Sequence, residues 1–193
     1  MNRILLVAIS FILTSCVTVA PVVNPNTELS IYGVSLMPPQ NEGWIVMVAN
    51  GYQVTLAKST SNKNESLVAN VSIFQLPELS SDKEFLEHVI RGHAEAPDIG
   101  RFEDQGTSDE LSSLNGAVCI KYHHMSKDKA AHVQGGNTAI MILENYGYNC
   151  QHPKNPRVGV HAEYSLRHFS ETTYPLLEQN SDAFFNTIEF GDF

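Results

Sequence analysis

Residues 44–58 read WIVMVANGYQVTLAK, two runs of apolar and β-branched residues on either side of Asn50-Gly51. Asn-Gly is the preferred centre of a two-residue hairpin turn, because both of its positions need a positive φ. A turn at this dipeptide places six side chains of the two runs on one side of the ribbon, in three facing pairs. The pairs are Ala49 with Tyr52, Met47 with Val54, and Ile45 with Leu56. The stretch therefore predicts an antiparallel hairpin with one apolar face.

The chain that follows this hairpin shows five more strand patterns and two helical ones. Alternating or continuous apolar runs predict strands at residues 67–76, 101–108, 117–125, 138–150 and 158–169. A helix is predicted at residues 82–96, because Ser81 and Glu84 match a capping box and Pro97 follows. Apolar residues at helical spacing predict a second helix at residues 175–188.

These patterns come in the order of three strands, a helix, four strands and a second helix. Hairpin-linked strands interrupted by helices at two points predict an α+β fold and not a parallel, doubly wound one. The run AIMIL at residues 139–143 is apolar on both faces, which indicates a central strand covered on two sides. We therefore expect residues 41–193 to form a single α+β domain, an antiparallel sheet of about six to seven strands with two helices packed on it.

Composition and motifs exclude several classes of function. The 193 residues are 42% hydrophobic and 17% charged, which excludes a disordered chain. The 12 basic and 21 acidic residues give a net charge of −9, which repels the phosphates of a nucleic acid. The sequence has no P-loop, no GxSxG elbow and no HExxH helix. We therefore expect no nucleic-acid partner and assign no catalytic residue and no cofactor, although an enzyme assembled from distant residues stays open.

The N-terminus carries a targeting pattern. A short basic start is followed by ten apolar residues at 4–13, half of the about 20 that a membrane-spanning helix needs, which is typical of a signal-peptide core. Leu13-Thr14-Ser15-Cys16 resembles the bacterial lipobox, in which a lipid is attached to the cysteine thiol and the signal is cut just before it. The resemblance implies a signal peptide at residues 1–15 and lipidation of Cys16. The open alternative is ordinary secretion with cleavage just before Pro21, a residue that is disfavoured after a cleavage site.

The lipobox also implies a location. Several acyl chains on one cysteine hold a protein stably on a membrane, and Val17, not Asp, follows Cys16. By resemblance to the enterobacterial sorting rules, we expect a cell-envelope protein anchored in the outer membrane and facing the periplasm.

Residues 16–40 show no lasting helical or alternating pattern. Glu28 is their only charged residue, and four of the nine prolines of the chain fall there. We expect this segment to be a lipidated N-terminus and a flexible, extended tether for the domain. The alternative left open is a first strand at residues 29–36 that packs on the domain.

Two further resemblances bear on fold and location. The order of the elements is similar to that of the PsbP-like fold, in which helices pack on an antiparallel sheet. The segment Tyr148-Asn149-Cys150-Gln151-His152-Pro153, followed by Tyr164-Ser165, resembles small uncharacterised proteobacterial lipoproteins. This likeness covers a small part of the chain and implies an envelope protein of this fold class without implying an activity.

Eight histidines raise the question of a metal site. Ligands on one helix lie three or four residues apart, whereas the two histidines of residues 82–96 are five apart and diverge. Adjacent residues of a strand point to opposite faces, so His123 and His124 do not act together. We therefore expect scattered surface or partly packed histidines and assign no metal ligand. The alternative left open is a site across strands, with His123 or His124 beside His152 or His161.

The two cysteines outside the lipobox, Cys119 and Cys150, are predicted to form a disulfide, because the lipobox implies a compartment beyond the cytoplasm. A hairpin turn at Gly135-Gly136 places Cys119 opposite His152 and makes Cys150 its diagonal neighbour on the same face. Diagonal Cα atoms lie about 7–8 Å apart, so a bulge or a twist must close the gap. A turn at residues 127–132 instead separates the two cysteines beyond bridging distance.

Three functions remain, in the order in which the sequence favours them. The first is a membrane-anchored, non-enzymatic envelope lipoprotein whose domain binds another envelope protein or supports an assembly. The second is a periplasmic module that binds a small ligand or a metal ion, which rests on the histidines. The third is a tethered hydrolase, which rests only on the existence of many lipid-anchored envelope enzymes.

Overall fold

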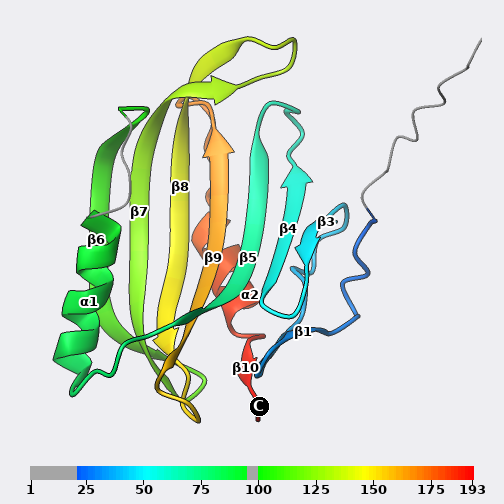
Figure 1. Cartoon of the computed structure of the whole chain (residues 1–193). Helices are drawn as coiled ribbons and strands as arrows, with labels where there is room; N and C mark the ends of the chain where they lie inside the picture. Colours follow the sequence, from blue (N-terminus) through cyan, green and yellow to red (C-terminus); the bar gives the residue numbers. More distant parts are fainter. Residues whose placement is uncertain (1–20, 95–99) are drawn as a thin grey trace, which may run out of the picture.

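Two antiparallel sheets and two helices make up the described part of the chain (Figure 1). The structure is a computed structural model and describes residues 21–94 and 100–193. The strands of the large sheet are β3 (Ile45–Ala49), β4 (Gln53–Ser59), β5 (Ser66–Gln75), β6 (Phe102–Leu114), β7 (Ala117–His132), β8 (Thr138–Gln151) and β9 (Val158–His168). The small sheet contains β1 (Leu29–Ile31), β2 (Val34–Leu36) and β10 (Glu189–Phe190), and the helices are α1 (Asp82–Ala94) and α2 (Leu177–Phe185).

The large sheet has the strand order β3-β4-β5-β9-β8-β7-β6, and all neighbouring strands are antiparallel. The predicted α+β class and antiparallel sheet are therefore confirmed. Sequential hairpins connect β3 to β5 and β6 to β9, and the pairing of β9 with β5 joins these two groups of strands into one sheet. Strands β6 and β7 continue well beyond their predicted ends at residues 108 and 125.

The two helices cover opposite faces of the large sheet (Figure 1). α1 packs on β6 and β7, where Phe85 and Val89 contact Ile120. α2 packs on β8 and β9 from the other side, where Phe184 and Phe185 join the main core. α1 covers only one end of its face, and polar side chains line the rest of that face. They include Asn70, Ser72, Asn145, Glu163 and Ser165. In the two described ranges, neither helix has the length and apolar character to cross a lipid bilayer.

The capping box at the start of α1 is present with one difference. Ser81 Oγ accepts the backbone N–H of Glu84 at 3.2 Å, and the Glu84 carboxylate accepts the N–H of Ser80, not of Ser81, at 2.7 Å. Both bonds involve N–H groups that lack a partner inside the helix. The helix is described as far as Ala94, and its predicted end at residues 95–96 lies outside the described residues.

The hairpin at Asn50 forms, but its predicted register is wrong. Ala49 lies opposite Val54, not Tyr52, and a bulge at Met47 exposes that side chain. The Asn50 side chain accounts for the wider turn, since its Oδ1 accepts the backbone N–H groups of Tyr52 and of the next residue at 2.8 and 2.9 Å. An Asn side chain that bonds to the backbone in this way stabilises a turn of its own.

The segment predicted as a flexible tether belongs to the domain instead. Its residues 29–36 form β1 and β2, and Ile31, Val34 and Leu36 are buried in the main core. The chain is already attached at Val22, which forms an isolated antiparallel bridge with Ile45. The alternative of a first strand at residues 29–36 packed on the domain is therefore correct in its packing, although the segment forms two short strands and not one. Residues 16–20 lie outside the described residues.

The small sheet joins the N-terminal hairpin to the C-terminal strand, because β2 pairs with β1 on one side and with β10 on the other. His152 is buried at this end of the domain. Its Nδ1 accepts the backbone N–H of Lys154 at 3.2 Å, so its Nε2 carries the proton and donates to the carbonyl of Gly33 at 2.9 Å. Both ring nitrogens are used, which makes His152 a structural residue and removes it from a site with the strand histidines.

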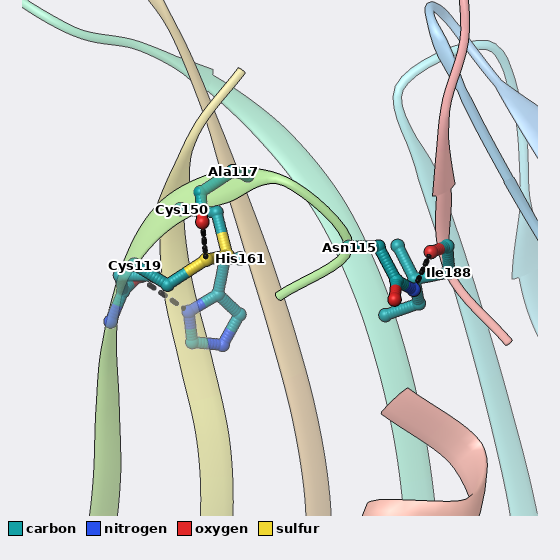
Figure 2. Close-up of a disulfide and its surroundings, with 7 residues drawn as sticks. Asn115, Ala117, Cys119, Cys150, His161 and Ile188 are labelled. Carbon is teal, nitrogen blue, oxygen red and sulfur yellow. Dashed lines mark hydrogen bonds between the residues drawn. A yellow bond between two sulfur atoms is a disulfide. The ribbon is translucent and has the colours of Figure 1, made fainter. Parts of the chain in front are cut away.

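The predicted pair Cys119 and Cys150 lies at bonding distance, with sulfur atoms 2.06 Å apart (Figure 2). The hairpin turns at Gly135-Gly136 as predicted, and both glycines have positive φ. Residue 133 pairs with residue 137, so the turn has three residues and shifts the predicted register by one, and a bulge between Asp128 and Ala131 shifts it by one more. The two cysteines therefore face each other directly, with Cα atoms 4.0 Å apart, and the turn and the bulge together close the gap left by the diagonal arrangement.

Candidate metal centre

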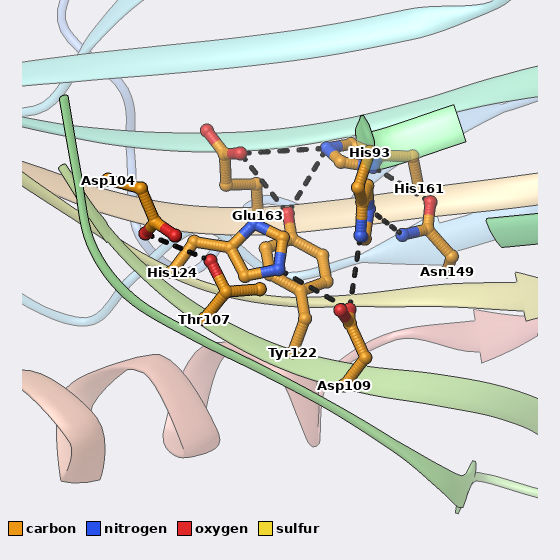
Figure 3. A network of polar contacts seen from close by, with 9 residues as sticks. All are labelled: His93, Asp104, Thr107, Asp109, Tyr122, His124, Asn149, His161 and Glu163. Carbon is orange, nitrogen blue, oxygen red and sulfur yellow. Dashed lines mark hydrogen bonds and ion pairs between the residues drawn. The ribbon is translucent and has the colours of Figure 1, made fainter. Parts of the chain in front are cut away.

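Three candidate ligands meet beneath the C-terminal end of α1 (Figure 3). His93 lies in the last turn of α1, Asp109 on β6 and His124 on β7. His93 Nδ1 lies 3.0 Å from Asp109 Oδ1, and His124 Nε2 lies 3.3 Å from the same oxygen. The three ligand atoms all lie within 4.8 Å of one another. Each residue is part-buried, so the group is held by its surroundings and is still open to solvent.

The sheet register and the packing of α1 bring these residues together. Asp109 lies opposite Tyr122, two residues before His124, so Asp109 and His124 are diagonal neighbours on one face. Val89 packs on that same face from α1. His93 follows Val89 by four residues, and residues four apart share a side of a helix, so the His93 ring is directed at the same pair.

Two imidazoles and a carboxylate suit ions such as zinc, iron, copper and nickel. A tetrahedral ion with bonds of about 2.0–2.1 Å separates its ligand atoms by about 3.3 Å, close to the spacings of 3.0 and 3.3 Å found here. His93 Nδ1 is buried and lies at ion-pair distance from Asp109 Oδ1, 3.0 Å away.

The surroundings of His93 keep its imidazole neutral. Burial lowers the pKa of His93, Asp109 opposes this shift, and the neighbouring His124 and His161 add to it, so that the pKa lies below its ordinary value. A neutral imidazole has the free nitrogen lone pair that a metal ion binds. At neutral pH, His93 is therefore in the form of a ligand.

Asn149 lies between two imidazoles and supports the group from behind. Its Oδ1 is 3.0 Å from His161 Nδ1, and its Nδ2 is 3.3 Å from His93 Nε2. When His93 binds a cation through Nδ1, its Nε2 must carry the proton and needs an acceptor. A half-turn of the Asn149 amide supplies its oxygen for that bond, the role that carbonyl and carboxylate oxygens commonly play behind metal-binding histidines.

The carboxylate of Glu163, with its partners Tyr122 and His161, lies next to the candidate ligands. Burial and the charge of Glu163 raise the pKa of Tyr122 well above its ordinary value, so the phenol keeps its proton and donates to Glu163 Oε2 at 3.1 Å. Burial alone raises the pKa of Glu163, but bonds from His161 and Tyr122 outweigh it and lower the pKa. Glu163 therefore stays charged, with His161 Nε2 3.8 Å from its Oε2.

The prediction of scattered histidines is wrong for three of the eight. His93, His124 and His161 converge on one face of the sheet. The alternative of a site across strands holds in part, because His124 and His161 share that face, but His161 reaches the group only through Asn149 and Tyr122. The group was missed because the spacing rules compare residues within one helix or strand, whereas the candidate ligands come from three different elements.

The histidine next to His124 points to the other face, as expected for neighbours on a strand. His123 Nε2 lies 2.9 Å from Glu144 Oε1, and its ring stacks on Tyr146 with centroids 4.2 Å apart. The His123 ring therefore already has a carboxylate and an aromatic partner on its own face of the sheet. The two adjacent histidines thus belong to separate polar groups on opposite sides of one strand.

Three protein ligands leave at least one position of a tetrahedral ion for water or another molecule, unlike the closed four-ligand sites that only stabilise a fold. The arrangement of His93, Asp109 and His124 can therefore hold an ion that stays accessible. No protein-family model matches the chain, and no curated protein matches it at the level required for significance.

Proposed function

We propose that this chain is a lipid-anchored envelope protein whose domain binds one divalent transition-metal ion. The observation that carries the metal proposal is the convergence of His93, Asp109 and His124, with ligand atoms within 4.8 Å of one another. The lipobox that ends at Cys16 supports the anchor. The proposal places the metal-binding alternative ahead of the protein-binding function that the sequence favours.

The donor atoms select the class of ion. Magnesium and calcium are bound mainly by oxygen, whereas two of the three donors here are imidazole nitrogens. Imidazole suits zinc, copper, iron and nickel. Zinc is the probe of choice, because it accepts tetrahedral sites of nitrogen and oxygen without a redox change.

The metal-free protein is expected to bind one zinc ion per chain. Calorimetric titration of the full chain in detergent measures this binding. The double variant His93→Ala/His124→Ala is expected to lose this binding. Removing a group that merely supports a ligand costs about 10–100-fold in affinity, and removing two ligands costs more. The matched control is His88→Ala, which removes a part-buried histidine from the same helix outside the three-ligand group. Absence of binding to the unaltered protein, or equal affinity of the double variant, would contradict the proposal.

The anchor has its own test. Cys16→Ala is expected to abolish incorporation of a radiolabelled fatty acid into the protein in cells, because the proposed lipid is attached to that thiol. Cys119→Ala is the control, since it removes a disulfide-bonded cysteine of the folded domain and leaves the lipobox intact. Equal label in the Cys16 variant and the unaltered protein would refute the lipobox assignment.

A further inference from the structure

Four exposed apolar side chains border the β3 edge of the large sheet (Figure 1). Val22 pairs with the first residue of β3, Met47 lies on β3, and Tyr52 follows the turn that ends it. Tyr32 joins them, because its backbone N–H donates to the carbonyl of the residue before Tyr52 at 2.8 Å. Each of the four is between 53% and 71% exposed. These four residues are called the β3-edge patch below.

The remaining exposed apolar residues are not grouped in this way. In the described ranges, ten large apolar side chains are exposed. The ring of Phe193 packs on Tyr32 with centroids 4.8 Å apart, so it supports the patch. The other five are spread over β5, α1, β6, β8 and the N-cap of α2. Single exposed apolar residues are normal on a protein surface, whereas a group of them marks an interaction surface.

The backbone itself turns two of the patch residues outward. Met47 has no partner on β4, because the register passes from Val46 to Val48 at a bulge, and bulges on edge strands re-aim a side chain. Tyr52 is held by the turn, since Asn50 Oδ1 accepts its backbone N–H at 2.8 Å. The exposure of both side chains is therefore built into β3 and its turn.

The place and the chemistry of the patch point to a lipid bilayer. The chain joins β3 at Pro21, next to Val22, and Cys16 lies only five residues earlier in the sequence. A lipid on Cys16 therefore brings a bilayer to this edge of the domain. The apolar ring and polar hydroxyl of tyrosine suit the headgroup region of a membrane. The patch has no charged side chain, so its burial avoids the high cost of taking a charge out of water.

We propose that the β3-edge patch lies against the headgroup region of the bilayer that carries the lipid anchor, an inference that rests on the anchor of the proposed function. The contact fixes the orientation of the domain, with the β3 edge toward the membrane and β6 away from it.

The test uses the full lipidated chain in phosphatidylcholine nanodiscs, with isotope-labelled methionine methyl groups observed by NMR. Met47 reports on the patch, and the part-buried Met125 on β7 is a control within the same chain. Lipids with a gadolinium chelate on the headgroup broaden the signals of nearby nuclei, and this effect falls steeply with distance. Five strand spacings put β7 about 24 Å from β3, so Met47 is expected to broaden about threefold more than Met125, or beyond that.

A double variant separates contact by the patch from tethering alone. Tyr32→Ser/Tyr52→Ser is expected to reduce the difference between Met47 and Met125 by about half or more, because less apolar surface then lies against the headgroups. The matched control is Ile140→Ser, which removes a side chain of β8 that is 57% exposed, and it is expected to change nothing. The comparison of the two methionines in the unaltered protein needs no variant.

The outcomes distinguish the patch from the anchor. Equal broadening of Met47 and Met125, or no broadening of Met47, overturns the inference, and the latter is expected if a second copy or another protein covers the patch. A double variant that behaves like Ile140→Ser also overturns it. Mass spectrometry of the same sample measures the lipid on Cys16. Absence of that lipid overturns the proposed anchor and this inference together, whereas equal broadening with the lipid present counts against the patch alone.

Discussion

A chain shortened to begin at Asn41 is expected to lose most or all of its stability. The truncation removes Ile31, Val34 and Leu36, which are 5%, 3% and 1% exposed. Burial of one such side chain contributes about 1.5–3 kcal/mol, so three contribute about 5–9 kcal/mol, against a total of about 5–15 kcal/mol for a typical domain. The truncation also leaves β10 without its only strand partner among the described residues. Urea unfolding followed by circular dichroism measures the loss.

A chain that begins at Pro21 is the matched control and is expected to unfold like the full domain. A point substitution gives the same test without truncation, since Leu36→Ala is expected to cost about 2–5 kcal/mol, whereas Ser30→Ala, at an exposed position of β1, is expected to cost little. A thermal midpoint within a few degrees of the control for the chain beginning at Asn41 would contradict the packing of β1 and β2.

Replacing Cys119 and Cys150 together by alanine is expected to lower the free energy of unfolding by about 3.5–4 kcal/mol. The bond closes a loop between residues 31 positions apart, and in the chain-entropy model a loop of this length restricts the unfolded chain by that amount. Both cysteines are buried, so the alanines leave a small additional deficit of packing. Urea unfolding of the variant beside the unaltered protein gives the difference.

The unaltered protein in excess reductant is the control, and its stability is expected to fall toward that of the double variant. Thiol counting on the denatured, unreduced protein checks the bond itself. Two free thiols per mature chain, counted with Cys16 modified, would show that Cys119 and Cys150 remain separate.

The parts of the fold that follow from local pattern were predictable. Alternation of apolar residues located the long strands, and the capping box located the start of α1. Register was less accessible, because single bulges at Met47 and between Asp128 and Ala131 shift the facing residues by one. The segment of β1 and β2 was predicted as a tether, with a single strand as the alternative, because each strand has three residues, too few for a periodic pattern, and is held by packing on the core.

The candidate metal centre could not be predicted from the sequence for a different reason. Asp109 lies on the part of β6 that continues beyond the predicted end of that strand at residue 108, where the residues are largely exposed and polar. His93 joins the strand residues only because α1 packs on β6 and β7, a packing that no spacing within the helix encodes. The opposite directions of His123 and His124 did follow from the sequence, because side chains alternate along any strand.

In the proposed lipid-anchored protein, the attachment of the chain at Pro21 limits the distance between the domain and the membrane. The Pro21 carbonyl accepts the N–H of Val46, so β3 holds the chain at that residue. With the lipid on Cys16, five residues reach at most about 17 Å from the anchor to β3. Six steps of about 4.8 Å between neighbouring strands then put β6 about 29 Å away from β3 across the sheet. In the proposed lipid-anchored protein, β3 therefore stays within about 17 Å of the anchor, and the candidate metal centre lies toward the opposite edge of the sheet.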